Sequence, residues 1–136
     1  MSGGYLLDSH VLLWLSPSEP TLPSRVLEVL SDTTRPLYAS VVSVVELSIK
    51  HATGKLDLPF GPEENAAEAF DELFHELGVE ALPLTTAHAA RMRDLPRHHG
   101  DPFDRLMICQ AMEEGLTLVT HDRTFARYDG LAVLWA

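Results

Sequence analysis

YLLDSHVLLW, residues 5–14, places a short apolar run directly before Asp8 and a second apolar stretch soon after it. The run at 5–8 is typical of a buried strand, and the stretch that begins near His10 is typical of a helix. Asp8 therefore lies where a strand passes into a helix, a position that suits a helix cap as well as a functional carboxylate. The segment predicts the first strand and helix of an α/β fold.

The same alternation of apolar runs and amphipathic stretches continues to the end of the chain. Further strands are predicted at 36–40, 79–84, 116–120 and 131–135. Helices are predicted between them, at 22–31, 43–54, 63–77, 86–95 and 102–114. Strands separated by helices favour right-handed crossovers, and hence a mostly parallel five-stranded sheet with helices on both faces.

Length and composition bound the class of protein. The chain has 136 residues, of which 46% are apolar, which is enough for a single domain that spans residues 1–136. Asp8, Ser9 and His10 interrupt the apolar run at the start, so it fits neither a signal peptide nor a membrane span. We therefore expect a cytoplasmic protein with no membrane partner.

The net charge of −10 argues against a nucleic-acid partner, because phosphates are contacted mostly by Lys and Arg. This acidity is regional, since residues 57–80 hold eight acids and no Lys or Arg. By contrast, residues 91–105 hold four arginines, and two more follow at positions 123 and 127. A local basic surface is therefore compatible with the negative total.

Four carboxylates are candidates for one edge of the predicted sheet. Asp8 ends the first strand and Asp122 follows the fourth, and ligands of open α/β sheets bind at the carboxyl ends of strands. Glu46 and Asp104 each lie in the first turn of a predicted helix. Two such charges about 4 Å apart repel by about 4 kcal/mol at an effective dielectric near 20. Mg²⁺ or Mn²⁺ is the natural compensating partner.

Each acid also has a purely structural interpretation, which the residues leave open. Asp8 suits the cap of the helix that follows it, and Asp122 suits the start of a turn or short helix. Ser43 and Glu46 form the S-x-x-E pattern of a capping box. Glu46 also precedes Lys50 by four residues, which is the spacing of an ordinary helical ion pair.

The stretch HGDPFDR, residues 99–105, carries the strongest structural alternative. Asp101, Pro102 and Asp104 suit the N-cap, N1 and N3 positions of a helix, which explains all three without a metal. His99 and the histidine before it lack the spacing of a zinc site, and we expect them in a solvent-exposed loop.

Several separated segments resemble, in order and spacing, the PIN-domain ribonucleases, and most closely the VapC toxins of bacterial toxin–antitoxin pairs. The segments are LLDSHVLLW, SVVELSIKHATGKLDLP, LPLTTAHAARMRDLPRHHGDPFDRLMICQA and LTLVTHDRTFARYDGLAVLW. The resemblance implies a three-layer α/β fold of the PIN type, with an acidic pocket that binds Mg²⁺ or Mn²⁺ and hydrolyses RNA.

The resemblance assigns roles to individual positions. The implied catalytic and metal-binding residues are four acids: Asp8, Glu46, Asp104 and Asp122. The implied accessory residues are Ser9, where the family often has Thr, Asp101, which belongs to the subgroup's DPFD pattern, and Thr120, which precedes the fourth acid. The candidates for contacts to RNA phosphates are Arg97, Arg105 and Arg123.

Two functions from different classes follow from these patterns. The first is a metal-dependent endoribonuclease toxin with an RNA substrate, a cognate antitoxin and a homodimeric state, all implied by the resemblance. The second is a non-catalytic PIN-like interaction module that uses its acidic helix, 63–77, to bind a basic partner. A metal-dependent phosphatase is disfavoured, because LLDSH lacks the second Asp of a D-x-D motif.

Overall fold

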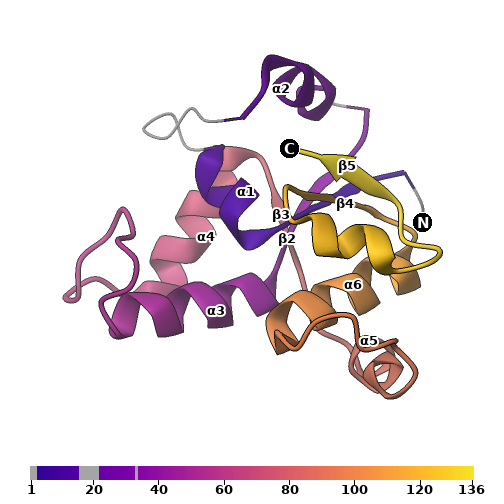
Figure 1. The fold of residues 1–136 in the computed structure, drawn as a ribbon. Helices are drawn as coiled ribbons and strands as arrows, with labels where there is room; N and C mark the ends of the chain where they lie inside the picture. The colour runs from indigo at the N-terminus through magenta and orange to yellow at the C-terminus, as the bar shows by residue number, and fades with distance from the viewer. Residues whose placement is uncertain (1–2, 16–21, 33) are drawn as a thin grey trace.

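The computed structural model describes residues 3–15, 22–32 and 34–136. Its five strands form one parallel sheet in the order β3-β2-β1-β4-β5 (Figure 1). The strands are β1 Tyr5–Leu7, β2 Leu37–Ser40, β3 Glu80–Leu82, β4 Thr117–Thr120 and β5 Val133–Trp135. Each lies within its predicted range, and the predicted parallel five-stranded sheet is confirmed.

The helices of the described residues also follow the predicted order. They are α1 Ser9–Trp14, α2 Ser24–Leu30, α3 Val41–Ala52, α4 Ala66–Leu77, α5 Thr86–Ala90 and α6 Pro102–Glu114, with short 3-10 helices η1 Arg91–Arg93 and η2 Arg123–Arg127. The helix predicted at 86–95 is divided into α5 and η1, and it ends at Arg93, before Pro96. Both α4 and α6 end at a left-handed glycine, Gly78 and Gly115, as their sequences predict.

Two apolar cores lie on the two faces of the sheet, which confirms the prediction of helices on both sides. Along β1, Tyr5 and Leu7 join a core with residues of α1, α2 and α4. Leu6 points to the opposite face and joins a core with residues of α6 and η2. Burial on both faces explains why the strands read as continuous apolar runs instead of alternating ones.

The strand order determines which loops become neighbours. β1 lies between β2 and β4, so the chain leaves these three adjacent parallel strands at the same edge of the sheet. The loops there lead into α1, α3 and η2. α6 packs against α3, so its first turn also approaches this edge (Figure 1).

None of the helices in the described part of the chain combines the length and the apolar character needed to cross a membrane.

Candidate active site

The acids implied by the resemblance come together at the carboxyl edge of the sheet. They line one cavity of about 330 Å³: Asp8, Glu46, Asp104 and Asp122. Further lining side chains are His10, Lys50, Asp101, His121 and Arg123. The position of Asp104, which the strand pattern alone could not place, is settled by the packing of α6 against α3.

Thr120 joins the ends of β1 and β4 through its hydroxyl group. Its Oγ1 donates to Oδ2 of buried Asp8 at 2.7 Å and accepts from the backbone N–H of Asp122 at 3.1 Å. The Asp8 carboxylate makes no capping hydrogen bond to α1, so the capping interpretation of Asp8 is wrong. The Asp122 carboxylate accepts from the N–H of Thr124 at 3.0 Å and caps η2, while it also lines the cavity.

The start of α3 differs from the predicted capping box. Ser40, the last residue of β2, supplies the cap, because its Oγ accepts from the N–H of Val42 at 2.9 Å. Ser43 consequently lies inside α3, buried, and a hydrogen bond of 2.8 Å joins its hydroxyl to that of Ser9. The S-x-x-E match is therefore not a cap, and Glu46 lies in the second turn of α3 instead of the first.

Both carboxylate oxygens of buried Glu46 have partners. Ser9 Oγ donates to Oε1 at 2.8 Å, and Lys50 Nζ lies 2.7 Å from Oε2. The predicted ion pair between Glu46 and Lys50 is confirmed, and Lys50 also lines the acidic cavity. Ser9 and Lys50 thus hold the carboxylate and offset part of its charge.

The two aspartates of HGDPFDR have different surroundings. Asp101 Oδ1 accepts from the N–H groups of Phe103 and Asp104 at 2.9 and 3.4 Å, with Pro102 as the first helical residue, so its predicted capping role is confirmed. Asp104 projects from the first turn of α6, and its side chain is only 16% exposed. Asp101 starts the helix and Asp104 is the more buried acid of the pair.

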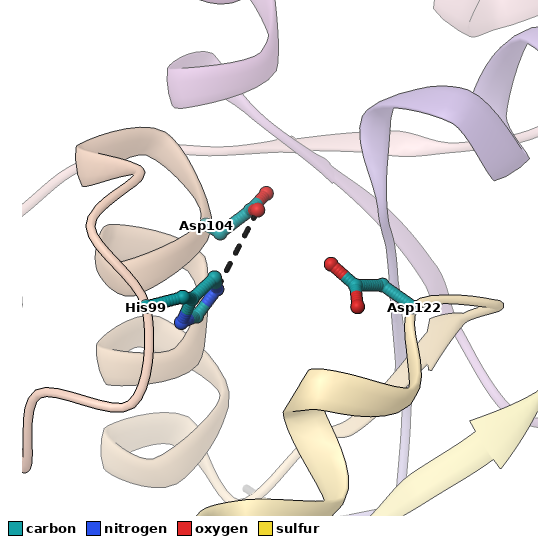
Figure 2. Close-up of side chains that lie close together, drawn as sticks. All are labelled: His99, Asp104 and Asp122. Carbon is teal, nitrogen blue, oxygen red and sulfur yellow. Dashed lines mark ion pairs between the residues drawn. The ribbon is translucent and has the colours of Figure 1, made fainter.

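His99 is a site residue that the sequence patterns miss. Its side chain is 15% exposed, so the expectation of a solvent-exposed loop is wrong here. Nδ1 lies 2.7 Å from the Tyr128 hydroxyl, and buried Nε2, 3.5 Å from Asp104 Oδ2, has no hydrogen-bond partner among the described residues. Ligand atoms of His99, Asp104 and Asp122 lie within 4.8 Å of one another, around a common space (Figure 2). No spacing rule links His99 to these acids.

Burial and repulsion disfavour charge in this cluster. Desolvation, with repulsion from the other carboxylates and Asp8 first among them, raises the pKa of Asp104 to about 8. Burial likewise raises the pKa of Asp8, against the hydrogen bond from Thr120, and it lowers the pKa of His99. Near neutral pH the Asp104 carboxyl and the His99 imidazole are therefore both mostly uncharged, although Nε2 and Oδ2 are close enough for an ion pair.

The raised pKa of Asp104 predicts a pH-dependent stability. The folded protein holds this proton more tightly than the unfolded chain, so the stability that it contributes is complete below pH 3.8 and is lost as the pH rises to about 8. Asp104→Asn mimics the protonated acid. We expect its metal-free unfolding free energy to equal that of the wild type near pH 4 and to exceed it increasingly up to pH 8, in urea titrations. A constant difference across this range would contradict the assignment.

Asp101 allows the cap to be tested apart from the metal. Asp101→Ala removes both capping hydrogen bonds and should lower the unfolding free energy by about 1 kcal/mol, whereas Asp101→Asn retains an accepting oxygen and should lower it much less. Neither change should abolish stabilisation by Mg²⁺ in thermal unfolding. Loss of that stabilisation in Asp101→Asn would instead show that this carboxylate binds the metal directly.

The three arginines named as RNA contacts differ in burial. Arg105 is 8% exposed, and its guanidinium donates to the carbonyl oxygens of Pro96 at 2.7 Å and Leu95 at 3.2 Å. Contact between Arg105 and RNA stays a prediction, which this burial disfavours because both terminal nitrogens of the guanidinium donate within the fold. Arg97 and Arg123 are exposed, and Arg123 lies at the acidic cavity with its guanidinium carbon 4.4 Å from the centre of the Trp135 ring.

The sequence that builds this sheet and this cavity matches a known family. The model of the PIN domain family matches residues 5–131. The chain belongs to the PIN domain family. A sequence relative of this PIN domain is ribonuclease VapC22 of Mycobacterium tuberculosis, 32% identical over 119 residues, which cover 87% of this chain and 86% of the relative.

Solved structures share the fold of this PIN domain at low sequence identity. VapBC2 from Rickettsia felis, bound to a DNA fragment from its promoter, has a TM-score of 0.71 at 18% identity, over 97% of this chain and 98% of that chain. VapBC-1 from nontypeable Haemophilus influenzae has a TM-score of 0.68 at 21% identity, over 96% of both chains. These likenesses confirm the PIN-like α/β architecture.

Proposed function

We propose that this PIN domain, as a single domain over residues 1–136, is a metal-dependent endoribonuclease that acts in the cytoplasm as the toxin of a toxin–antitoxin pair. The observation that carries the proposal is the convergence of Asp8, Glu46, Asp104 and Asp122 in one cavity. Repulsion among these carboxylates lowers the stability of the fold, and a bound dication would offset it. The similarity to a ribonuclease supports RNA as the substrate.

The donor set fits a hard dication, which we propose to be Mg²⁺ or Mn²⁺. The cavity offers carboxylate oxygens, the donors that these ions prefer, and within the described part of the chain the buried Nε2 of His99 has no hydrogen-bond partner. Asp8, Glu46, Asp104 and Asp122 would hold the ion. When bound, it would supply an activated water for in-line attack on a phosphodiester and would stabilise the developing charge.

The chain's own residues prepare the cavity for this chemistry. Thr120 and Ser9 donate to Asp8 and Glu46, so these carboxylates are oriented before any ligand enters. Arg123 at the cavity, and Arg97 at a second pocket that His99 also lines, would supply exposed guanidinium groups for RNA phosphates. Binding of RNA therefore depends on a few local cations, although the net charge of the chain is negative.

We also propose a cognate antitoxin and a homodimeric state. The solved structures of similar fold include VapBC assemblies and a toxin–antitoxin complex from Klebsiella pneumoniae, which supports an antitoxin partner. On α3, Val45 and Ile49 lie one turn apart and are each 50% exposed, an apolar pair that supports an interface between protein chains.

RNA cleavage by the purified protein, free of antitoxin, tests the proposed activity. Wild-type protein should cleave RNA with Mg²⁺ and stop when EDTA removes it. Asp8→Asn should lower the cleavage rate at least about 100-fold, because it removes a metal ligand. Asp71→Asn, on the exposed face of α4, is the matched control and should cleave like the wild type.

Two outcomes would overturn the proposal. Undiminished cleavage by Asp8→Asn would remove this cavity from the reaction. Absence of both cleavage and any Mg²⁺-dependent change in thermal stability would favour the non-catalytic module, whose acidic α4 would then be its binding surface.

A further inference from the structure

One wall of the acidic cavity is aromatic. His10 and His121 are exposed and line the cavity, and Trp14 of α1 packs beside them. The Trp14 and His121 ring centres lie 4.7 Å apart with planes at 55°, and the His10 ring centre lies 6.2 Å from each of the other two. We call His10, Trp14 and His121 the aromatic wall.

The aromatic wall is built on the same segments as the acids. His10 lies in the first turn of α1, two residues after Asp8, and His121 directly precedes Asp122 after β4. In the described part of the chain, neither imidazole takes part in a hydrogen bond or an ion pair with another side chain. Their contacts are with aromatic rings, and core packing does not account for exposed rings at the mouth of a polar cavity.

Exposed aromatic rings are the usual platform for unpaired nucleobases, because every base has a π-face and stacking needs no fixed hydrogen-bond pattern. The cations that line this cavity are Lys50 and Arg123, and an uncharged stacking contact adds to the affinity that so few phosphate contacts supply. A base attached to a nucleotide next to the scissile bond necessarily lies close to the residues that hold the phosphate. His10 and His121 of the aromatic wall line the same cavity as the four acids, and Trp14 packs against both of these rings.

We propose that the aromatic wall is a nucleobase subsite, on which an unpaired base next to the cleaved phosphodiester stacks. The proposal rests on the ribonuclease function proposed above and specifies its substrate class as single-stranded RNA. A base stacked on the exposed His121 ring, against which Trp14 packs, has its sugar–phosphate next to the cavity that the carboxylates line. Double-stranded RNA cannot offer this base without unpairing.

Abasic nucleotides in a short single-stranded RNA test the proposal. The base is removed in turn at each position within two nucleotides of the cleaved bond. Wild-type protein should lose about 10-fold in kcat/KM when the stacked base is missing. His121→Ala should show a similar loss on intact RNA, mostly as a higher KM, and no further loss on that abasic RNA. His121→Phe should restore cleavage of intact RNA, and His75→Ala, at an exposed position on α4, should behave like the wild type.

Binding gives a second readout that does not need cleavage. The tryptophans of this chain are Trp14 and Trp135, so Trp135→Phe leaves Trp14 as the reporter. In the Asp8→Asn background, intact RNA should quench Trp14 fluorescence, whereas RNA lacking the stacked base should quench it much less.

The outcomes separate this proposal from the proposed function. The subsite would be overturned if His121→Ala cleaved intact RNA as fast as the wild type does. It would also be overturned if removal of the base slowed His121→Ala as much as it slows the wild type. If wild-type protein does not cleave RNA, the proposed activity fails, while base-dependent quenching of Trp14 would still support the subsite. If His121→Ala unfolds, cleavage of intact and abasic RNA is compared between His121→Phe and the wild type, and both should lose activity to the same extent when the base is missing. Quenching of Trp14 that does not depend on the base would overturn the proposal.

Discussion

Replacement of Asp104 by asparagine should make the metal-free protein more stable and the site inactive. The substitution keeps the shape of the side chain and removes the carboxyl whose pKa its neighbours raise to about 8. Near that pH we expect the unfolding free energy to rise by about 1 kcal/mol or more, because repulsion and desolvation of the charge disappear. Cleavage of RNA should fall at least about 100-fold, since a ligand of the dication is lost.

Urea unfolding near pH 8, with and without Mg²⁺, measures both parts of this prediction. The wild type should be stabilised by Mg²⁺, whereas Asp104→Asn should gain little. Asp71→Asn is the matched control, because it removes the charge of an exposed acid on α4 that does not line the cavity. A lower stability of metal-free Asp104→Asn would instead make Asp104 a structural residue of the first turn.

Replacement of Arg105 by methionine should destabilise the protein by about 2–4 kcal/mol. The guanidinium is buried and donates to the carbonyl oxygens of Leu95 and Pro96, and methionine leaves both without these donors. These hydrogen bonds tie the segment before α6 to the helix that carries Asp104. The loss should also loosen His99, which lies in that segment.

Chemical unfolding distinguishes this role from contact with RNA. Arg97→Met, at an exposed arginine nearby, should change the unfolding free energy by less than about 0.5 kcal/mol. It should lower the affinity for RNA and make that affinity less sensitive to salt concentration. Arg105→Met should show the reverse pattern at temperatures where it remains folded. Normal stability with weakened RNA binding in Arg105→Met would restore Arg105 as a phosphate contact.

The cap of α6 and the start of α3 show how far local patterns extend. D-P-x-D was read correctly as N-cap, N1 and N3, because all of its contacts lie within one helical turn. S-x-x-E in α3 has the same local form, yet Ser40 supplies the cap and Ser43 is buried against Ser9. A capping pattern predicts that a helix begins nearby, and the end of the preceding strand decides at which serine.

The residues of the site likewise fall into those that local sequence predicts and those that it does not. Asp8 and Asp122 were predictable at the sheet edge, because each follows a strand whose apolar run is visible in the sequence. His99 and Arg105 were not, since their burial depends on Tyr128 and on the loop that contains Leu95 and Pro96. A histidine or arginine in a polar segment carries no local mark of its burial.

Local sequence alone determined the strands, most helix positions and the residue types available for a metal site, because apolar periodicity and capping act over a few residues. Tertiary structure decided which of these residues meet. The order β2-β1-β4 places the ends of three strands side by side, and the packing of α6 against α3 adds Asp104 to them. Burial there then raises the pKa of Asp104, an effect of neighbours that are distant in the chain.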